Sequence, residues 1–362
     1  MAWMMYLQNV AGAIQSRDGM RLARLFSRRH SPVMRMKAAD FARIDMKKCS
    51  DIVLSPLDMT AYSHLKSMEA RDDVKAAFIH QRNAVKNFKD FMAKSDDANL
   101  VLPALEQLTL DLRLLASSVD TLAARTGEKS DALEAAMSDI RECFVVVCSD
   151  RAPLSTSKKW GMMFLINHLF SIALKLNNFA VVESFRRAMV RETEMMEYFH
   201  MSHRVTYSYH LGRLYLFNSQ YELANKELSF AFQHCHRSST TNKRLILIHL
   251  IPINILRGRL PAPSLLEKYD LQQFADITSA LRTGNVHQFK EALATHQPFF
   301  VQWGIFLILE RALGLVYRRL LKKVYVTSLG SVFYISGKLL IAPLLIWAKR
   351  NLSLSLPFSV TH

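Results

Sequence analysis

The side chains of this chain that are best suited to chemistry are basic, and many of them occur as adjacent pairs. Guanidinium and ammonium groups neutralise nucleic-acid phosphates without reading the base sequence. A single pair is more often a solvated helix face, but pairs on successive helices can align into one basic stripe. From such pairs we predict a sequence-independent nucleic-acid-binding site at Lys243, Arg244, Arg318, Arg319, Lys322 and Lys323.

The net charge of the chain favours an acidic partner. The 362 residues include 47 Lys and Arg against 31 Asp and Glu, which gives a formal net charge of +16. Charge of this size bears on partners and solubility rather than on fold. We expect a polyanion or an acidic protein as the companion. The alternative is that the excess charge only keeps the surface soluble.

None of the common catalytic or phosphate-cradling motifs occurs in the sequence. It lacks G-x-G-x-x-G, G-x-x-x-x-G-K, G-x-S-x-G and H-E-x-x-H, and no two glycines lie closer than seven residues apart. Glycines so widely spaced cannot build loops of those types. We therefore predict a protein that is not an enzyme, with no catalytic residues and no cofactor.

The run His234-Cys235-His236 is the strongest candidate for a metal site. Adjacent residues on a helix point in different directions, and no second ligand pair lies at a suitable spacing. We therefore predict no metal site, with Cys235 in the core and the two histidines on the surface. The other cysteines, Cys49, Cys143 and Cys148, also sit in apolar contexts, which is typical of reduced thiols in an intracellular protein.

Helices are the elements that must position these residues. The chain has only 11 glycines and 10 prolines, and apolar residues recur at spacings of three and four. This pattern predicts an all-α fold that opens with a helix hairpin turning at Asp18-Gly19. Amphipathic helices should follow from Asp58 to Gly127, broken at residues 95–97 and at Pro103.

The stretch 158–235 predicts TPR-like helical repeats. Two helix-turn-helix units superpose with an offset of 42 residues, so that Phe179 and Tyr221 take equivalent places. Each helix pair can bury its apolar stripe only against its neighbours. The alternative is two unrelated hairpins in a bundle. A buried helix at 242–256 and a long helix at 299–325 should complete the pattern.

Residues 227–239, 242–258, 304–311 and 322–325 resemble the PCI-domain subunits of transcription-and-export complex 2. The likeness runs from the N-terminus to about Val326, and the PCI subunits associated with the COP9 signalosome are close cousins. It implies TPR-like repeats that lead into a PCI domain. The domains would be an N-terminal helical region (1–150), the repeats with the helical part of the PCI domain (158–326) and a divergent apolar tail (327–362).

This family resemblance also implies a function in the nucleus, near nuclear pores, with some protein in the cytoplasm. The expected role is a scaffold subunit in mRNA export. Its expected partners are a large scaffold of the germinal-centre-associated nuclear protein type, a small acidic proteasome-lid-type subunit, and an RNA or DNA backbone. The alternative is a protein-binding subunit of a signalosome-like or proteasome-lid-like assembly that does not bind nucleic acid.

The tail after Val326 departs from the family, which would continue there into the rest of a winged helix. We predict that the winged helix is truncated or replaced. Residues 329–348 are apolar enough to raise a membrane-anchored adaptor as a third alternative, but Lys338 and Pro343 interrupt a segment of barely sufficient length. We therefore expect no membrane span.

Overall fold

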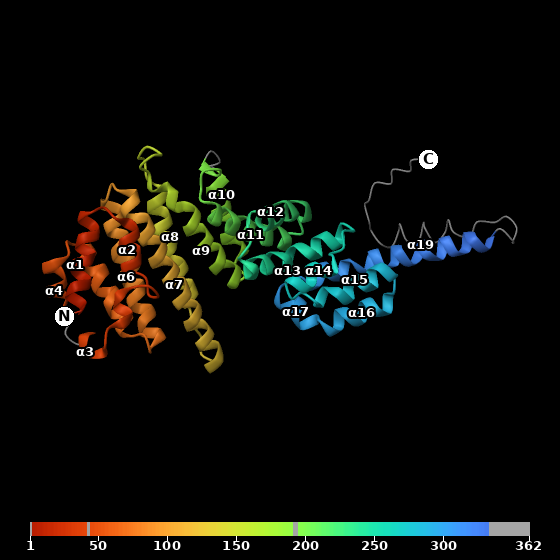
Figure 1. Ribbon diagram of the computed structural model, residues 1–362, viewed down its shortest axis with the longest axis horizontal. Coiled ribbons are helices and arrows are strands. Elements are labelled where there is room, and N and C mark those ends of the chain that lie inside the picture. The colour runs from red at the N-terminus through yellow and green to blue at the C-terminus, as the bar shows by residue number, and fades with distance from the viewer. Residues whose placement is uncertain (1, 42–43, 191–194, 333–362) are drawn as a thin grey trace. The chain divides into compact units, whose positions relative to one another are not determined.

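The computed structural model describes residues 2–41, 44–190 and 195–332, and every regular element in these ranges is a helix (Figure 1). The predicted all-α fold is therefore confirmed. The first ten α-helices are α1 (Ala2–Gln15), α2 (Gly19–Leu25), α3 (Ala38–Phe41), α4 (Met46–Ile52), α5 (Leu57–Glu69), α6 (Val74–Lys94), α7 (Ala98–Thr126), α8 (Ala132–Cys148), α9 (Met162–Lys175) and α10 (Phe179–Val190). The others are α11 (Met201–Phe217), α12 (Tyr221–His234), α13 (Thr240–Leu256), α14 (Pro263–Lys268), α15 (Gln273–Thr283), α16 (Val286–Thr295), α17 (Gln297–Gln302), α18 (Phe306–Arg311) and α19 (Leu313–Val332).

Contacts between Cα atoms divide the chain into two compact units, residues 1–210 and 211–362. The division falls within α11. The domain boundaries predicted from sequence, at 150–158 and after 326, stay predictions.

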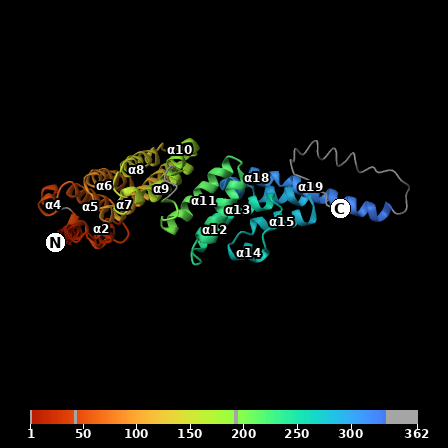
Figure 2. The same ribbon diagram turned by 90° about the horizontal axis from the view of Figure 1, so that it is seen from above.

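Successive helices of the first unit pack side by side. In sequence order α5 packs on α6, α6 on α7, α7 on α8 and α8 on α9, and Figure 2 shows these helices following one another. Large side chains fill the interfaces, among them Phe26, Phe88 and Phe170, which are fully buried. This is the continuous apolar interior that stacked helix pairs require.

The close approach of α2 to α7 depends on Gly19. A Cβ atom built there would lie 2.8 Å from the Leu100 carbonyl oxygen and still closer to that of Asn99. The predicted break at Pro103 was wrong, because α7 runs through this residue from Ala98 to Thr126. Proline has no N–H to bond the carbonyl four residues earlier, which is that of Asn99. The lost hydrogen bond is tolerated because Pro103 lies near the start of α7, where Gly19 of α2 packs close to the Asn99 carbonyl.

Replacing Gly19 with alanine should destabilise the first unit. The added methyl group would collide with backbone atoms, which cannot swing aside as a side chain can, so we expect a loss of about 2 kcal/mol or more in the free energy of unfolding. Gly12→Ala is the matched control, since a Cβ at Gly12 meets nothing within 4 Å. Within a helix that change should stabilise by about 0.5–1 kcal/mol. Urea unfolding followed by circular dichroism measures both, and equal values for the two variants would contradict the close approach.

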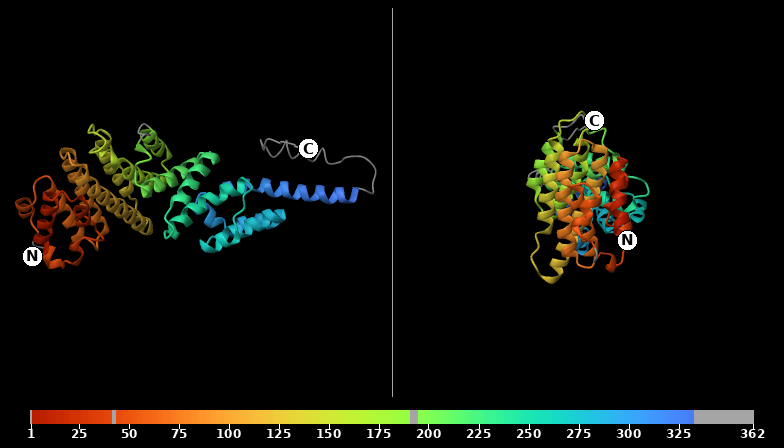
Figure 3. Two further views of the ribbon diagram at one scale, coloured as in Figure 1. Left: turned by 45° about the horizontal axis from the view of Figure 1, so that its top comes forward. Right: turned by 90° about the vertical axis from the view of Figure 1, so that its left-hand side faces the viewer.

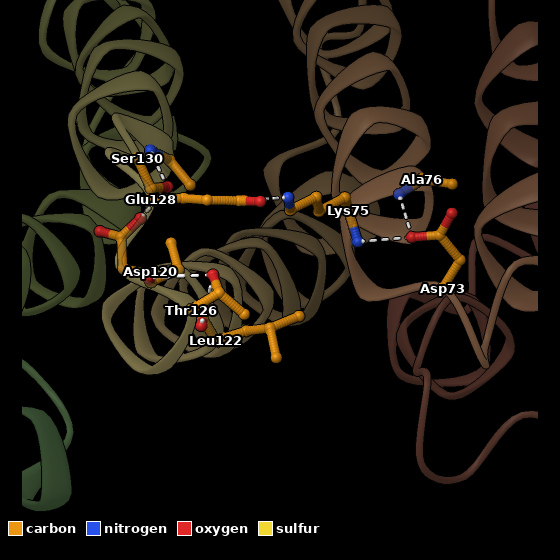
Figure 4. A network of polar contacts seen from close by, with 10 residues as sticks. Asp73, Lys75, Ala76, Asp120, Leu122, Thr126, Glu128 and Ser130 are labelled. Carbon is orange, nitrogen blue, oxygen red and sulfur yellow. Dashed lines mark hydrogen bonds and ion pairs between the residues drawn. The ribbon is translucent and has the colours of Figure 1, made fainter.

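Polar contacts join α6 to both of its later neighbours. Arg82 Nε lies 2.6 Å from Oδ2 of Asp139 on α8, whose side chain is only 3% exposed, and Lys86 Nζ lies 3.6 Å from its other oxygen. At the start of α6 Lys75 reaches the exposed Glu128, just beyond the end of α7, at 2.6 Å (Figure 4). The first contact is buried and the second is solvated, so only the first should matter much for stability.

The two predicted repeats share their turn geometry. Asn177 and Ser219, which are 42 residues apart, both adopt left-handed backbone, with φ of 54° and 57°. The next amide in each turn, that of Asn178 or Gln220, donates to the carbonyl five residues earlier at 2.8 Å. Such a bond closes a helix end with a left-handed residue. Helices α9, α10, α11 and α12 all lie within the predicted stretch 158–235, and α10 and α12 begin at Phe179 and Tyr221.

In the second unit α12 packs on α13, and α15 and α16 pack together and on α19. The predicted long helix at 299–325 was wrong, because α17, α18 and α19 divide this stretch. Gly304 lies between the first two with φ of 67°, a conformation that ends helices. The C-terminal part of α19 extends beyond α15 and α16 (Figures 1 and 3).

Three of the cysteines are buried free thiols. Cys49 and Cys143 are fully buried in the first unit, and Cys235 is 7% exposed in the second. Burial raises the pKa of Cys49 to about 11 and that of Cys143 to about 12, and it also raises the pKa of Cys235. The prediction of Cys235 in the core, between surface residues His234 and His236, is confirmed.

Of the described helices, none is both long and apolar enough to cross a bilayer. The predicted apolar tail at 327–362 continues α19 as far as Val332. Its remainder, residues 333–362, lies outside the described residues, as does most of the 329–348 segment.

Candidate nucleic-acid interface

Arg318 and Lys322 form the most accessible part of the predicted site. Both are exposed on α19, and neither makes a hydrogen bond or ion pair with another described residue. They are four residues apart, so their side chains lie on one face of the helix. Two adjacent cations with free donors are suited to contact two phosphates.

Arg319 and Lys323 lie on the neighbouring stripe of α19, against the turn between α15 and α16. Lys323 Nζ donates to the carbonyl oxygen of Thr283, the last residue of α15. The next residue, Gly284, has φ of 72°, and a Cβ there would lie 3.2 Å from Arg319 Cγ. The Lys323 hydrogen bond therefore holds α19 against this turn, whereas Arg319 is exposed and passes close to Gly284.

Lys243 and Arg244 begin α13 and also have partners within the protein. Lys243 Nζ lies 4.7 Å from the ring centre of Phe232 and donates to its carbonyl oxygen at 3.2 Å. Arg244 donates to the carbonyl oxygens of Tyr269 and Asp270 at 3.1 and 3.2 Å. These contacts tie α13 to α12 and to the turn before α15.

The six predicted residues do not form a single cluster. Arg244 binds the chain at Asp270, before α15, whereas Lys323 binds it at Thr283, where α15 ends. Helix α15 has 11 residues, which separate its ends by about 16 Å at 1.5 Å a residue. The two groups of basic residues therefore occupy separate positions on the surface.

An exposed aromatic residue lies beside the basic face and was missed by the sequence-based prediction. Tyr325 is 43% exposed on α19, close in sequence to Lys322 and Lys323. Aromatic rings interleaved with basic residues are typical of surfaces that stack single-stranded bases. That interleaving is visible in the sequence and could have signalled the residue.

Apolar side chains also lie exposed on this part of α19. Leu320 and Val324, again four residues apart, are 38% and 52% exposed. Apolar groups in such a row gain free energy when a partner covers them. The same helix therefore offers one stripe suited to phosphates and another suited to a protein.

In the described ranges, no group of three or more His, Cys, Asp or Glu side chains is arranged to hold a metal ion. The exposed cations can neutralise and position phosphates, which is binding chemistry rather than bond-making chemistry.

Fold and surface together define an all-α helical-repeat protein with an exposed face on α19 that is basic and partly apolar. No family model matches the sequence. Known proteins do match it. PCI domain-containing protein 2 of Xenopus laevis is 41% identical over 330 residues, which cover 88% of this chain and 81% of the relative. The Drosophila melanogaster homologue is 33% identical over 326 residues, covering 89% and 82%. Protein CSN12 homolog of Schizosaccharomyces pombe is 31% identical over 296 residues, covering 77% and 69%.

The chain belongs to the PCI domain-containing protein 2 family. The family resemblance read from residues 227–239, 242–258, 304–311 and 322–325 is thereby confirmed.

Proposed function

We propose that this chain is a non-enzymatic scaffold subunit of the nuclear mRNA-export complex, transcription-and-export complex 2. In this role it binds a large scaffold of the germinal-centre-associated nuclear protein type, a small acidic proteasome-lid-type subunit and nucleic acid. Membership of the PCI domain-containing protein 2 family carries the proposal. The corresponding location is the nucleus, near nuclear pores, with some protein in the cytoplasm.

The net charge of the chain and the surface of its second unit support these binding roles. A net charge of +16 suits both an acidic subunit and a phosphate backbone. On α19, Arg318 and Lys322 are free to contact phosphates, while Leu320 and Val324 offer an apolar row to the large scaffold. Lys243, Arg244 and Lys323 contribute positive charge and hold the helices that present this face, and Arg319 adds further charge.

A second candidate function is that of a protein-binding subunit in a signalosome-like or proteasome-lid-like assembly, without nucleic-acid binding. The match to Protein CSN12 homolog supports this alternative. The sequence also resembles the PCI subunits that are associated with the COP9 signalosome. In that case the basic surface serves acidic protein partners only.

Purification of the tagged full chain from its own cells distinguishes the two functions. We expect the large export scaffold and the small acidic subunit to co-purify. The double variant Leu320→Glu/Val324→Glu should lose the large scaffold, because burying a carboxylate in an apolar contact is costly. Leu122→Glu/Val145→Glu, which places the same charges on exposed apolar sites of the first unit, is the control and should retain it.

Recovery of signalosome or proteasome-lid subunits without the export scaffold would favour the second function. Retention of the scaffold by both double variants would show that the scaffold binds the chain elsewhere than on α19, although the assembly still forms.

A further inference from the structure

A polar cavity of about 160 Å³ lies in the first unit, lined by α7, α9 and the first part of α11. Its polar lining includes Glu106 and Arg113 from α7, Asn167, His168 and Ser171 from α9, and His203 from α11. The cavity is partly open to solvent, because the Glu106 side chain is 41% exposed and Thr206 is also exposed.

Arg113 places a positive charge in this cavity without a carboxylate to balance it. Its guanidinium donates from Nε to His168 Nδ1 at 3.2 Å and from Nη1 to Ser171 Oγ at 3.1 Å, and both acceptors are neutral. Among the described residues, no Asp or Glu oxygen lies within ion-pair distance of Arg113. Burial lowers its pKa, as expected for a desolvated cation lacking an opposite charge.

The lining includes one acidic residue, Glu106, and its position on α7 is distant from Arg113. It precedes Arg113 by seven residues on α7, which is about 10 Å along the helix axis. Its Oε1 lies 3.6 Å from Nε2 of His203 instead. A half-buried cation with no acid beside it costs free energy, so an anion at the Arg113 end would stabilise the arrangement.

Among the buried polar atoms of the lining, His168 Nε2 and Asn167 Oδ1 have no hydrogen-bond partner within the described ranges. Because His168 Nδ1 accepts from Arg113, the neutral ring carries its proton on Nε2, and that N–H has no acceptor. Asn167 donates from Nδ2 to the His203 carbonyl at 2.9 Å, but its Oδ1 accepts from no donor. Beside the cavity there are therefore a donor, the His168 Nε2–H, and an acceptor, Asn167 Oδ1, that no described residue uses.

We propose that this cavity is a binding site for a phosphate group, held by Arg113, Ser171 and His168. Phosphate fits the donor set because each of its oxygens accepts hydrogen bonds, and Arg and hydroxyl groups are common phosphate ligands. A hydrogen phosphate ion also carries an O–H group, which can donate a hydrogen bond to Asn167 Oδ1. Sulfate has no such O–H group at neutral pH. This site is separate from the face of α19 and does not depend on the proposed function.

Binding of inorganic phosphate to the full chain tests the proposal. Titration at constant ionic strength, followed by the phosphorus-31 line width, should show saturable binding. Arg113→Gln should weaken it about tenfold or more, since a charge-assisted hydrogen bond is lost. Arg125→Gln, on the exposed end of the same helix, is the matched control and should bind as the wild type does.

Competition experiments identify the ligand, and a second variant keeps the test valid if Arg113→Gln does not fold. Ribose 5-phosphate competing as well as inorganic phosphate would assign the site to attached phosphate groups, and its failure to compete would assign it to the free ion. Sulfate should compete more weakly than phosphate. Ser171→Ala, a small change that keeps the charge, should weaken binding severalfold even if Arg113→Gln does not fold. Absence of saturable binding, or equal binding by wild type and both site variants, would overturn the proposal.

Discussion

Replacing Arg318 and Lys322 with glutamine should weaken the binding of single-stranded RNA about 25-fold at 0.1 M salt and about tenfold at 0.2 M. Each cation that neutralises a phosphate contributes about 0.7 to the slope of log affinity against log salt on single strands. Losing two such contacts lowers the slope by about 1.4, which produces these two ratios when variant and wild type bind equally at about 1 M salt. Fluorescence polarisation with a labelled homopolymer, across about 50–200 mM salt, measures the slope directly.

The matched control for this experiment is Lys129→Gln/Lys226→Gln. Both lysines are exposed, one in each unit, and their removal subtracts the same formal charge away from α19. If the two double variants lose affinity equally, only the net charge matters and α19 is not the interface. An unchanged slope in Arg318→Gln/Lys322→Gln would place the phosphate contacts elsewhere.

Replacing Arg82 with methionine should lower the free energy of unfolding of the first unit by about 3 kcal/mol. The change leaves the Asp139 carboxylate, which is 3% exposed, without its 2.6 Å partner. Lys86 limits the loss, since its Nζ remains 3.6 Å from Asp139 Oδ1. Chemical unfolding followed by circular dichroism measures the effect.

Two comparisons separate burial from simple pairing in this prediction. Lys89→Met breaks a pair of equal length, 2.6 Å to Glu142, but Glu142 is 50% exposed. That variant should lose only about 0.5 kcal/mol, because water replaces the partner. Adding Asp139→Asn to Arg82→Met should restore part of the stability by removing the unpaired charge. Equal losses for Arg82→Met and Lys89→Met would contradict the role given to burial.

Much of the fold could be predicted because helical periodicity and turn residues are local signals. The 42-residue offset was visible in the sequence, and the left-handed residues Asn177 and Ser219 confirm it. The errors have local causes too. Pro103 was predicted to end a helix, but its position near the start of α7 makes the missing N–H tolerable. The predicted long helix at 299–325 ran through Gly304, whose left-handed backbone separates α17 from α18.

The candidate sites were less accessible to sequence reasoning, because they depend on contacts between distant residues. Lys243 and Lys322 look alike in the sequence, yet one lies on the Phe232 ring and the other faces solvent. The Arg113 cavity gave no signal, since its main partner, His168, lies 55 residues further along the chain. Only packing reveals that a cation has no acid beside it.

The buried thiols give each half of the molecule its own chemical reporter of opening. A maleimide or iodoacetamide reacts with the thiolate, and at neutral pH the raised pKa values of Cys49 and Cys143 leave almost none of it, even apart from burial. Labelling of these residues therefore follows exposure of the first unit, and labelling of Cys235 follows that of the second. Peptide mass spectrometry after a short pulse could thus time the two events separately in one sample, with no probe engineered into the chain.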